Sequence, residues 1–91
     1  MEFEWDPIKA ENNLKKHGVS FKEAATVFGN SLSITYPDPD HSIDEYRFIT
    51  IGSSNDGILL IVSHTDRDER IRIISAREAT RQEKKFYEEE S

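Results

Sequence analysis

Residues 58–75 read ILLIVSHTDRDERIRIIS, and this stretch decides the fold. The run Ile58–Thr65 opens with five apolar residues, so that both of its faces are apolar, which predicts a strand in the centre of a sheet. The run Arg70–Ser75 alternates arginine with isoleucine, which predicts a strand with one basic and one apolar face. Only the charged residues 66–69 separate the two runs, so we expect an antiparallel hairpin.

Two further stretches before this hairpin show the same two-residue period. They are Leu32–Tyr36 and Tyr46–Gly52, and a long acidic loop that opens at Pro37 joins them. Short connections between consecutive strands favour antiparallel pairing, so we predict an antiparallel meander of three to four strands. A separate short strand is expected at residues 3–5.

A first helix is expected over Pro7–His17. Aspartate is a preferred N-cap residue, so Asp6 suits the start, and proline suits the first helical position. Glycine is the residue that most often ends a helix in the left-handed conformation, so Gly18 marks the end. The expected apolar stripe of this helix consists of Ile8, Ala10 and Leu14.

Two Ser-x-x-Glu capping boxes predict the starts of the other helices. The box at Ser20 precedes a second helix over Phe21–Phe28. The box at Ser75 precedes a final helix that runs through Tyr87. The chain is therefore expected to form one α+β domain over residues 1–91, with two N-terminal helices, the meander and a C-terminal helix.

The overall charge argues at first against a nucleic-acid ligand. The chain has 12 basic and 18 acidic side chains, which give a formal net charge of -6. The excess acid lies around residues 38–45 and in residues 88–91, whereas residues 64–87 carry seven basic and five acidic side chains. A polyanion can therefore still bind on the side formed by the last strand and helix, although mixed charges are also typical of an ordinary solvated surface.

The composition excludes or disfavours several kinds of site and location. The chain has no cysteine, which excludes disulfides, thiolate metal sites and a cysteine nucleophile. No apolar run is long enough to span a membrane, and the acidic N-terminus lacks the apolar region of a secretory signal, so we expect a cytoplasmic protein. The acidic 38–45 loop is a candidate cation site, but it lacks the glycine and the terminal glutamate of a calcium loop, so we expect no metal or other cofactor.

A group of histidine and arginine residues suits one specific reaction. The group consists of His64, Arg67, Arg70, Arg72 and Arg77. Cleavage of RNA without a metal needs a group that takes a proton from the 2′-OH, a fixed positive charge for the phosphorane and a proton for the 5′-oxygen. Histidine titrates near neutral pH and arginine keeps its charge, so the group fits this chemistry. The arginines can instead pair with the acidic residues 66–69, and His64 can be a structural strand-end residue.

Other candidate residues also have two interpretations. Lys16 and His17 place positive charge in the last turn of the first helix, which stabilises a helix without any ligand. Tyr87 can stack on a base or pack against the sheet, and Trp5 is expected to be a core or interface anchor.

The sequence resembles the BrnT family of type II toxins at motifs that follow in order along nearly the whole chain. The motifs are Phe3-Glu4-Trp5-Asp6-Pro7, Lys16-His17-Gly18-Val19-Ser20-Phe21, Asp40-His41-Ser42 and Arg72-Ile73-Ile74-Ser75-Ala76-Arg77, followed by Ala79, Glu83 and Tyr87. The resemblance implies a variant of the RelE-type ribonuclease fold and an RNA-cleaving toxin that inhibits translation and growth. It also implies a BrnA-type antitoxin partner with a DNA-binding domain, in a hetero-oligomer that represses its own operon through the antitoxin.

The resemblance favours the ribonuclease interpretation of the histidine and arginine group. Arg67 and Arg77 are then expected to hold the scissile phosphate, and His64 to act as acid or base. The RNA-binding residues are expected to be Lys16, His17, Arg72 and Tyr87. We expect the antitoxin to cover the basic side with an acidic or amphipathic segment. A different class of function stays open, namely a non-catalytic partner that binds the antitoxin and tunes its affinity for operator DNA as a co-repressor.

Overall fold

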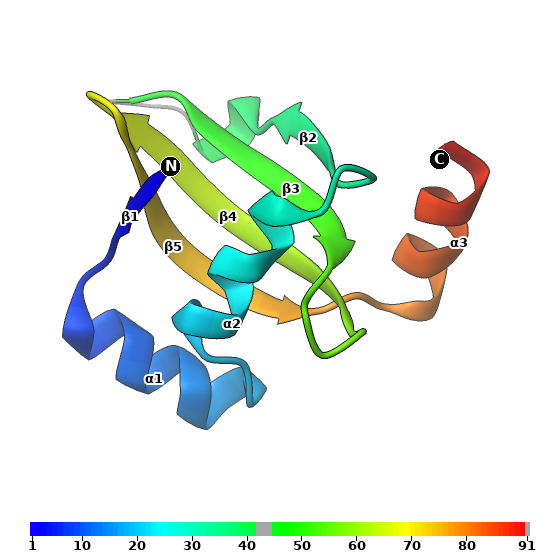
Figure 1. Cartoon of the computed structure of the whole chain (residues 1–91), viewed down its shortest axis with the longest axis horizontal. Helices are drawn as coiled ribbons and strands as arrows, with labels where there is room; N and C mark the ends of the chain where they lie inside the picture. Colours follow the sequence, from blue (N-terminus) through cyan, green and yellow to red (C-terminus); the bar gives the residue numbers. More distant parts are fainter. Residues whose placement is uncertain (42–44, 91) are drawn as a thin grey trace.

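The computed structural model describes residues 1–41 and 45–90, and a five-stranded sheet forms its centre (Figure 1). In chain order the elements are β1 (Glu2–Glu4), α1 (Pro7–His17), α2 (Phe21–Thr26), the 3-10 turn η1 (Val27–Gly29), β2 (Ile34–Pro37), the 3-10 turn η2 (Pro39–His41), β3 (Arg47–Ser53), β4 (Leu59–Arg67), β5 (Arg70–Glu78) and α3 (Arg81–Glu90). Helices α1 and α2 lie together on one side of the sheet, and α3 lies beyond the end of β5. The fold is thus of the predicted α+β class.

The strand order is β1-β5-β4-β3-β2, so β4 is the central strand, as its apolar run predicts. Strands β2 to β5 form a four-stranded antiparallel meander. The short strand β1 pairs parallel to β5, with Phe3 opposite Ile71. The predicted antiparallel meander is therefore part of a mixed sheet, because the short N-terminal strand joins the edge of the same sheet as a fifth, parallel strand.

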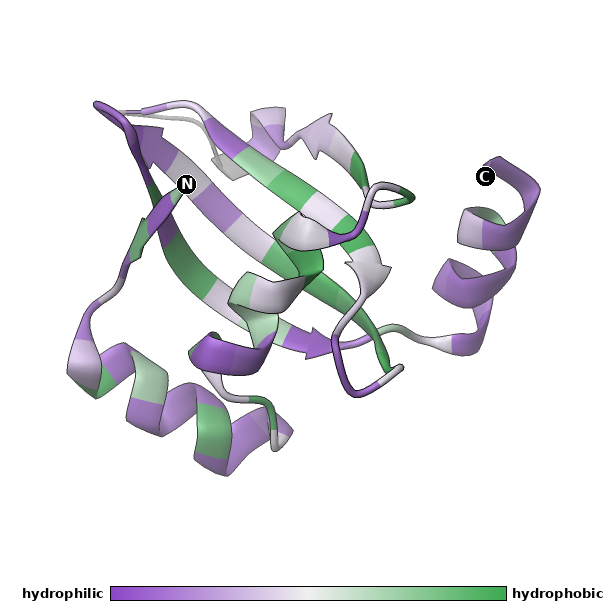
Figure 2. Ribbon diagram, in the orientation of Figure 1, coloured by the Kyte–Doolittle hydropathy of each residue, from purple (hydrophilic) through white to green (hydrophobic). Residues whose placement is uncertain are grey.

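The larger of two cores lies between the sheet and helices α1 and α2. Phe21 and Val27 from the helical side pack with Leu60, Val62 and Ile73 from the sheet, and each of the five is at most 1 % exposed. Figure 2 shows the hydrophobic stretches of β3, β4 and β5 beside mostly hydrophilic α1 and α3 helices. The fold therefore depends on burying one face of the hairpin that the sequence identified.

A smaller core lies on the other face of the sheet. It consists of Ile51, Ile61 and Ala79, against which Tyr36 and Tyr87 pack. Because Tyr87 belongs to α3, this core attaches the C-terminal helix to the sheet.

A β-bulge in β5 determines which face its later residues occupy. In the pairing of β4 with β5, Ile74 is the extra residue. Ile73 and Ala76 consequently both lie in the core under the helices, although residues three apart lie on opposite faces of a regular strand. After Ile74, every residue of β5 therefore lies on the opposite face of the sheet from the one that simple alternation predicts.

Helix α1 begins and ends where the sequence predicts. The carboxylate of Asp6 accepts hydrogen bonds from two backbone N–H groups of the first turn, and Gly18 closes the helix with a φ of 70°. The predicted apolar stripe is largely wrong, because Ile8 is 70 % exposed and Leu14 is 50 % exposed. The buried residue of this helix is Asn13, at 7 % exposure.

The other two helices differ from the prediction at their ends. The segment Phe21–Phe28 is helical throughout but changes from α2 to the tighter turn η1. The predicted capping box at Ser75 is wrong, because that residue lies inside β5. The cap of α3 is instead a reciprocal pair in which the Thr80 N–H donates to Glu83 Oε1 (2.8 Å) and the Glu83 N–H donates to Thr80 Oγ1 (3.2 Å).

Candidate functional site

The face of the sheet turned away from α1 and α2 carries five arginine residues. Directly paired residues of neighbouring strands share a face, so the strand register identifies the set. The arginine face consists of Arg47, Arg67, Arg70, Arg72 and Arg77. Without the bulge at Ile74, Arg77 would lie on the apolar face under the helices.

Three of these arginines form ion pairs at one end of the hairpin. The pairs are Arg67 Nε with Glu45 Oε2 (3.4 Å), Arg70 Nε with Glu2 Oε2 (3.5 Å) and Arg72 Nη1 with Glu4 Oε2 (2.8 Å). The carboxylates come from β1 and from the segment before β3, rather than from residues 66–69 as the sequence suggested. The paired side chains are 26–71 % exposed, so each pair contributes little stability and a phosphate can replace the carboxylate.

Arg77 makes a closer ion pair than these three arginines. Its Nη1 and Nη2 lie 2.7 and 2.8 Å from the two carboxylate oxygens of Glu83, in a forked arrangement. Hydrogen bonds from Arg77 lower the pKa of Glu83 to about 2, and the Glu83 carboxylate raises the pKa of Arg77. The Arg77 side chain remains 40 % exposed. Its guanidinium is therefore held in one orientation and is still accessible to a ligand.

His64 lies on the opposite face, enclosed by aromatic rings. It is 3 % exposed, with the ring of Phe28 edge-on at 4.8 Å and that of Phe48 stacked at 5.8 Å between centroids. Its Nε2 is 2.8 Å from Thr50 Oγ1, and its buried Nδ1 is 3.8 Å from Asp66 Oδ1, beyond hydrogen-bond distance. Burial lowers the pKa of His64, although Asp66 partly opposes this shift. Neither ring nitrogen is open to a phosphate in this conformation.

The structure thus separates the three residues that were expected to surround one phosphate. Arg67 and Arg77 share a face but lie at opposite ends of the hairpin, about 20 Å apart along β5. His64 lies on the opposite face of the sheet from both arginines. Arg72 lies on the arginine face between the other two, as its predicted RNA-binding role requires.

The remaining predicted RNA-binding residues lie elsewhere. Lys16 and His17 are exposed at the end of α1, on the helical side of the sheet. Tyr87 packs against the smaller core, and its hydroxyl donates a hydrogen bond to the Leu32 carbonyl oxygen (3.0 Å). The packing interpretation of Tyr87 is therefore the one that its contacts favour.

A cleft between α3 and the sheet adjoins the forked pair. Its volume is about 370 Å³, and its walls include Ile49, Ile51 and Ile61 from the sheet. Arg77 and Glu83 also line this α3 cleft. A fixed guanidinium beside an apolar cleft can bind an anionic ligand and stabilise charge that develops on it. Sequence reasoning missed this arrangement, because the bulge and the true start of α3 produce it.

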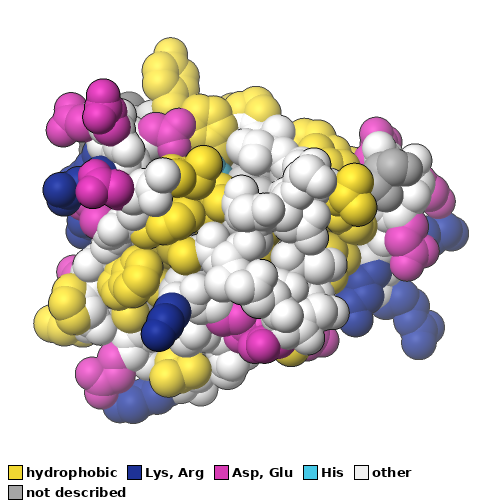
Figure 3. Space-filling view, in the orientation of Figure 1, with side chains coloured by type: hydrophobic (Ala, Val, Ile, Leu, Met, Phe, Trp, Pro, Cys, Tyr) yellow, Lys and Arg dark blue, Asp and Glu magenta, His cyan; other side chains and the backbone are white. Residues whose placement is uncertain are grey.

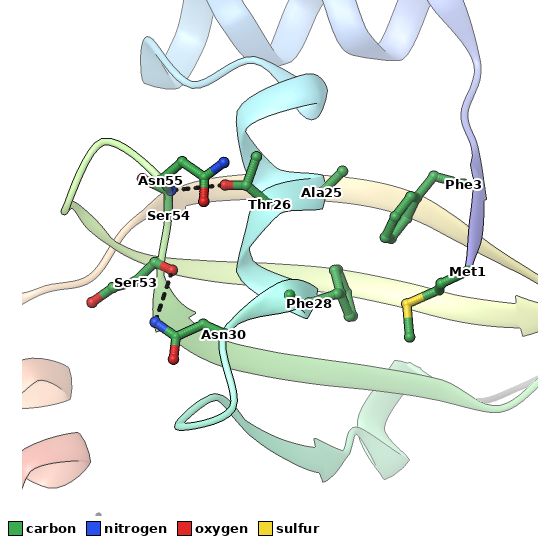
Figure 4. Close-up of a pocket in the computed structure, with 10 residues that line it drawn as sticks. Met1, Phe3, Ala25, Thr26, Phe28, Asn30, Ser53, Ser54 and Asn55 are labelled. Atoms are coloured by element: carbon green, nitrogen blue, oxygen red, sulfur yellow. Dashed lines mark hydrogen bonds between the residues drawn. The ribbon is translucent and has the colours of Figure 1, made fainter.

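A second cavity, of about 480 Å³, lies on the helical side (Figure 4). Met1, Phe3 and Phe28 line one end, and hydroxyl and amide side chains line the other. Figure 3 shows hydrophobic side chains gathered on this side of the molecule over β1, α1 and α2. No lysine or arginine lines this cavity, in contrast to the α3 cleft with its Arg77.

Neither a metal cluster nor a membrane-spanning helix is present in the described part of the chain. Within residues 1–41 and 45–90, no three His, Asp or Glu side chains converge on a common metal position. Residues 42–44 of the acidic loop, and with them part of the candidate cation site, lie outside the described residues. No described helix is long and apolar enough to cross a membrane.

Comparisons with known proteins agree with the sequence resemblance. Residues 5–83 match the family model described as the ribonuclease toxin BrnT of type II toxin–antitoxin systems. The crystal structure of the Brucella abortus ribonuclease toxin BrnT is similar, with a TM-score of 0.71 and 25 % sequence identity over 89 % of this chain and 99 % of that one. No curated protein matches the chain. The chain belongs to the BrnT family of ribonuclease toxins of type II toxin–antitoxin systems, which implies an antitoxin partner.

Proposed function

We propose that this protein cleaves RNA on the arginine face and that Arg77 contacts the scissile phosphate. The observation that supports this assignment is the fork between Arg77 and Glu83 beside the α3 cleft. Glu83 fixes the guanidinium without enclosing it, so the remaining N–H donors of Arg77 are directed by the protein before RNA arrives. Such preorganisation is what stabilisation of a transition state requires.

In the proposed reaction the 2′-oxygen of one ribose attacks the adjacent phosphorus. A P–O bond forms to the 2′-oxygen, the bond to the 5′-oxygen breaks, and the products are a 2′,3′-cyclic phosphate and a 5′-hydroxyl. A solvent water takes the proton from the 2′-OH and another supplies a proton to the departing 5′-oxygen, while Arg77 stabilises the extra negative charge of the phosphorane. Because the nucleophile belongs to the substrate, we propose that no metal is needed.

The other arginines have a binding role in this proposal. Arg72, and further along the face Arg67, contact phosphates on one side of the scissile one, because they lie on the same face at increasing distance from Arg77. Their partners Glu45 and Glu4 form surface ion pairs that a phosphate can displace. His64 takes no proton-transfer step, since both of its ring nitrogens are enclosed; it instead orders β3 and β4 through Thr50.

The proposal extends to the partner and the fold. The antitoxin is of the BrnA type with a DNA-binding domain, and the hetero-oligomer represses its operon through that domain. The family membership and the order of two helices, a meander and a final helix support this proposal and a RelE-like description of the fold.

One observation favours a second candidate function. Arg67, Arg70, Arg72 and Arg77 each have a carboxylate partner, so much of the local positive charge of residues 64–87 is neutralised. A protein of this kind can bind an antitoxin and tune its operator affinity as a co-repressor, without cleaving RNA.

Cleavage of a labelled single-stranded RNA by purified protein in EDTA tests the proposal. Arg77→Ala should lower the rate at least ~100-fold, as the loss of one transition-state donor does. Arg81→Ala removes an exposed arginine of α3 and serves as the matched control, with a rate close to wild type. Intact RNA with wild-type protein, together with tighter operator binding by the antitoxin, would establish the co-repressor function instead.

The salt dependence of RNA binding tests the wider surface. Each phosphate contact contributes about 0.7 to the magnitude of the negative slope of log affinity against log salt for a single strand. Arg67→Ala and Arg72→Ala should each reduce the slope by about this amount. Lys16→Ala should leave the slope unchanged, because Lys16 lies on the helical side. A slope that Lys16→Ala reduces, and that Arg67→Ala and Arg72→Ala leave unchanged, would place the RNA at the end of α1.

A further inference from the structure

The α3 cleft contains an aromatic side chain that is only partly packed. Phe86 lines the cleft and is 44 % exposed. No residue of α3 is fully buried. The Phe86 ring contacts Tyr36 at 5.7 Å between centroids and an angle of 53°. Because Phe86 is 44 % exposed beside this contact, part of its ring is accessible to a planar ligand. The neighbouring Tyr87, in contrast, is tied to the sheet through its hydroxyl.

The other walls of the cleft suit a nucleobase. Ile49, Ile51 and Ile61 present apolar surface against which a planar ring can lie. A base extruded from an RNA chain is commonly held between an aromatic ring and apolar side chains. The volume of about 370 Å³ accommodates such a ring with water at its edges.

The cleft also offers polar groups at two positions. The amide of Gln82 carries donors and an acceptor, which is the combination that reads the edge of a base. Among the residues described, none forms a side-chain hydrogen bond with it. Arg77 stands at the same cleft, and the base and phosphate of one nucleotide are joined through a single ribose. A nucleotide can therefore place its phosphate at Arg77 while its base enters the cleft.

We infer that the α3 cleft is a nucleobase subsite, in which Phe86 stacks on one unpaired base of the RNA and Gln82 contacts its edge. This inference rests on the proposed ribonuclease function, since it places the base beside the phosphate that Arg77 contacts. It assigns base stacking to Phe86 rather than to Tyr87, and it makes Gln82 a determinant of base preference.

Binding of a short 2′-O-methyl RNA that contains 2-aminopurine tests the inference without cleavage. Stacking on an aromatic ring quenches the fluorescence of 2-aminopurine, so wild-type protein should quench it. Phe86→Leu keeps an apolar side chain but removes the aromatic face, and should abolish quenching and weaken binding about ten- to hundred-fold. Phe86→Trp should restore both, and Ile58→Ala, which removes an exposed apolar side chain outside the cleft, should behave as wild type.

The outcomes separate this inference from the proposed function. Unchanged quenching in a folded Phe86→Leu protein, with RNA still cleaved by wild type, would overturn the subsite and leave the ribonuclease proposal intact. Quenching that Phe86→Leu abolishes, with no cleavage of ordinary RNA by wild type, would support the subsite and overturn the ribonuclease. As a second variant, Gln82→Ala should alter the relative cleavage after different bases, and an unaltered preference would refute its assigned contact.

Discussion

The side-chain amide of Asn13 pairs with the backbone of Ala76, 63 residues later in the chain. Its Nδ2 donates to the Ala76 carbonyl oxygen (2.8 Å), and its Oδ1 accepts from the Ala76 N–H (3.1 Å). The same Nδ2 also donates to the Val19 carbonyl oxygen (3.0 Å). Strand β1 pairs with β5 only at residues 70–72, so Asn13 satisfies the free edge of β5 where no strand covers it. Helix α1 is thus attached to the sheet through a buried amide.

We expect Asn13→Ala to destabilise the protein by about 2–4 kcal/mol, because it leaves buried backbone groups of Ala76 without a partner. Asn12→Ala, at the exposed neighbouring position, should change the free energy of unfolding by less than about 0.5 kcal/mol. Urea denaturation of the two variants measures the difference. Equal stabilities would show that the Asn13 bonds contribute nothing net.

This contact shows where sequence reasoning succeeds and where it ends. The start of α1 at Asp6, its end at Gly18 and the central position of β4 follow from local signals, and the structure confirms all three. A buried asparagine in a polar helix gives no such signal, because its partner lies 63 residues away. The exposure of Ile8 was unpredictable for the same reason, since the tertiary contact decides which side of the helix is buried.

The candidate site was predictable in its residue types but not in its geometry. The positions of Arg72 and Arg77 differ by an odd number, so strict alternation would place the two side chains on opposite faces of the sheet. Only the bulge at Ile74 puts them on the same face. Nothing in the local sequence marks a bulge there. The burial of His64 likewise depends on Phe28 and Phe48, which approach it from other elements.

The forked pair provides a prediction about acid stability. Glu83→Gln keeps an acceptor for the Thr80 N–H but removes the charge that Arg77 binds. Because the folded-state pKa of Glu83 is about 2, below its value of 4.5 in an unfolded chain, the stabilisation is complete above about pH 4.5 and disappears as the pH falls toward 2.

At pH 7 we expect the Glu83→Gln variant to lose about 1 kcal/mol or less, since solvent screens this partly exposed pair. The difference from wild type should shrink steadily when urea denaturation is repeated below pH 4.5. A difference that stays constant down to pH 2 would mean that the carboxylate charge is not its source.

His64 provides a prediction about stability near neutral pH. Burial lowers its pKa, so the unfolded chain takes up a proton near pH 6.5 before the folded protein does. Stability should therefore fall as the pH drops below about 6.5, by up to about 1.4 kcal/mol per pH unit while only the unfolded chain is protonated. His64→Gln should remove this slope, and His17→Gln, at an exposed position, should retain it. Thermal melting between pH 7.5 and 5.5 measures how stability changes with pH in each variant. Loss of the pH dependence in His17→Gln, with the dependence retained in His64→Gln, would contradict the assignment to His64.

The contact between Gly52 and Ser33 leads to a prediction about packing. A Cβ atom at Gly52 would overlap Ser33 Oγ, which donates a hydrogen bond to the Val27 carbonyl oxygen (2.7 Å). Gly52→Ala should therefore destabilise the protein by about 1–3 kcal/mol, the usual effect of overpacking. Gly29→Ala, where a Cβ meets nothing within 4 Å, is the matched control and should be tolerated.

Ser33→Gly removes the overlapping Oγ and Cβ atoms and leaves only the Ser33 Cα, 3.1 Å from the new methyl group. The double variant should consequently be less destabilised than the sum of the two single variants, by more than about 0.5 kcal/mol. This coupling distinguishes a steric clash from a change in the unfolded chain, because glycine-to-alanine effects on the unfolded chain are independent of residue 33. Additive free energies of unfolding would show that β3 and the segment before β2 are not in contact as the structure describes.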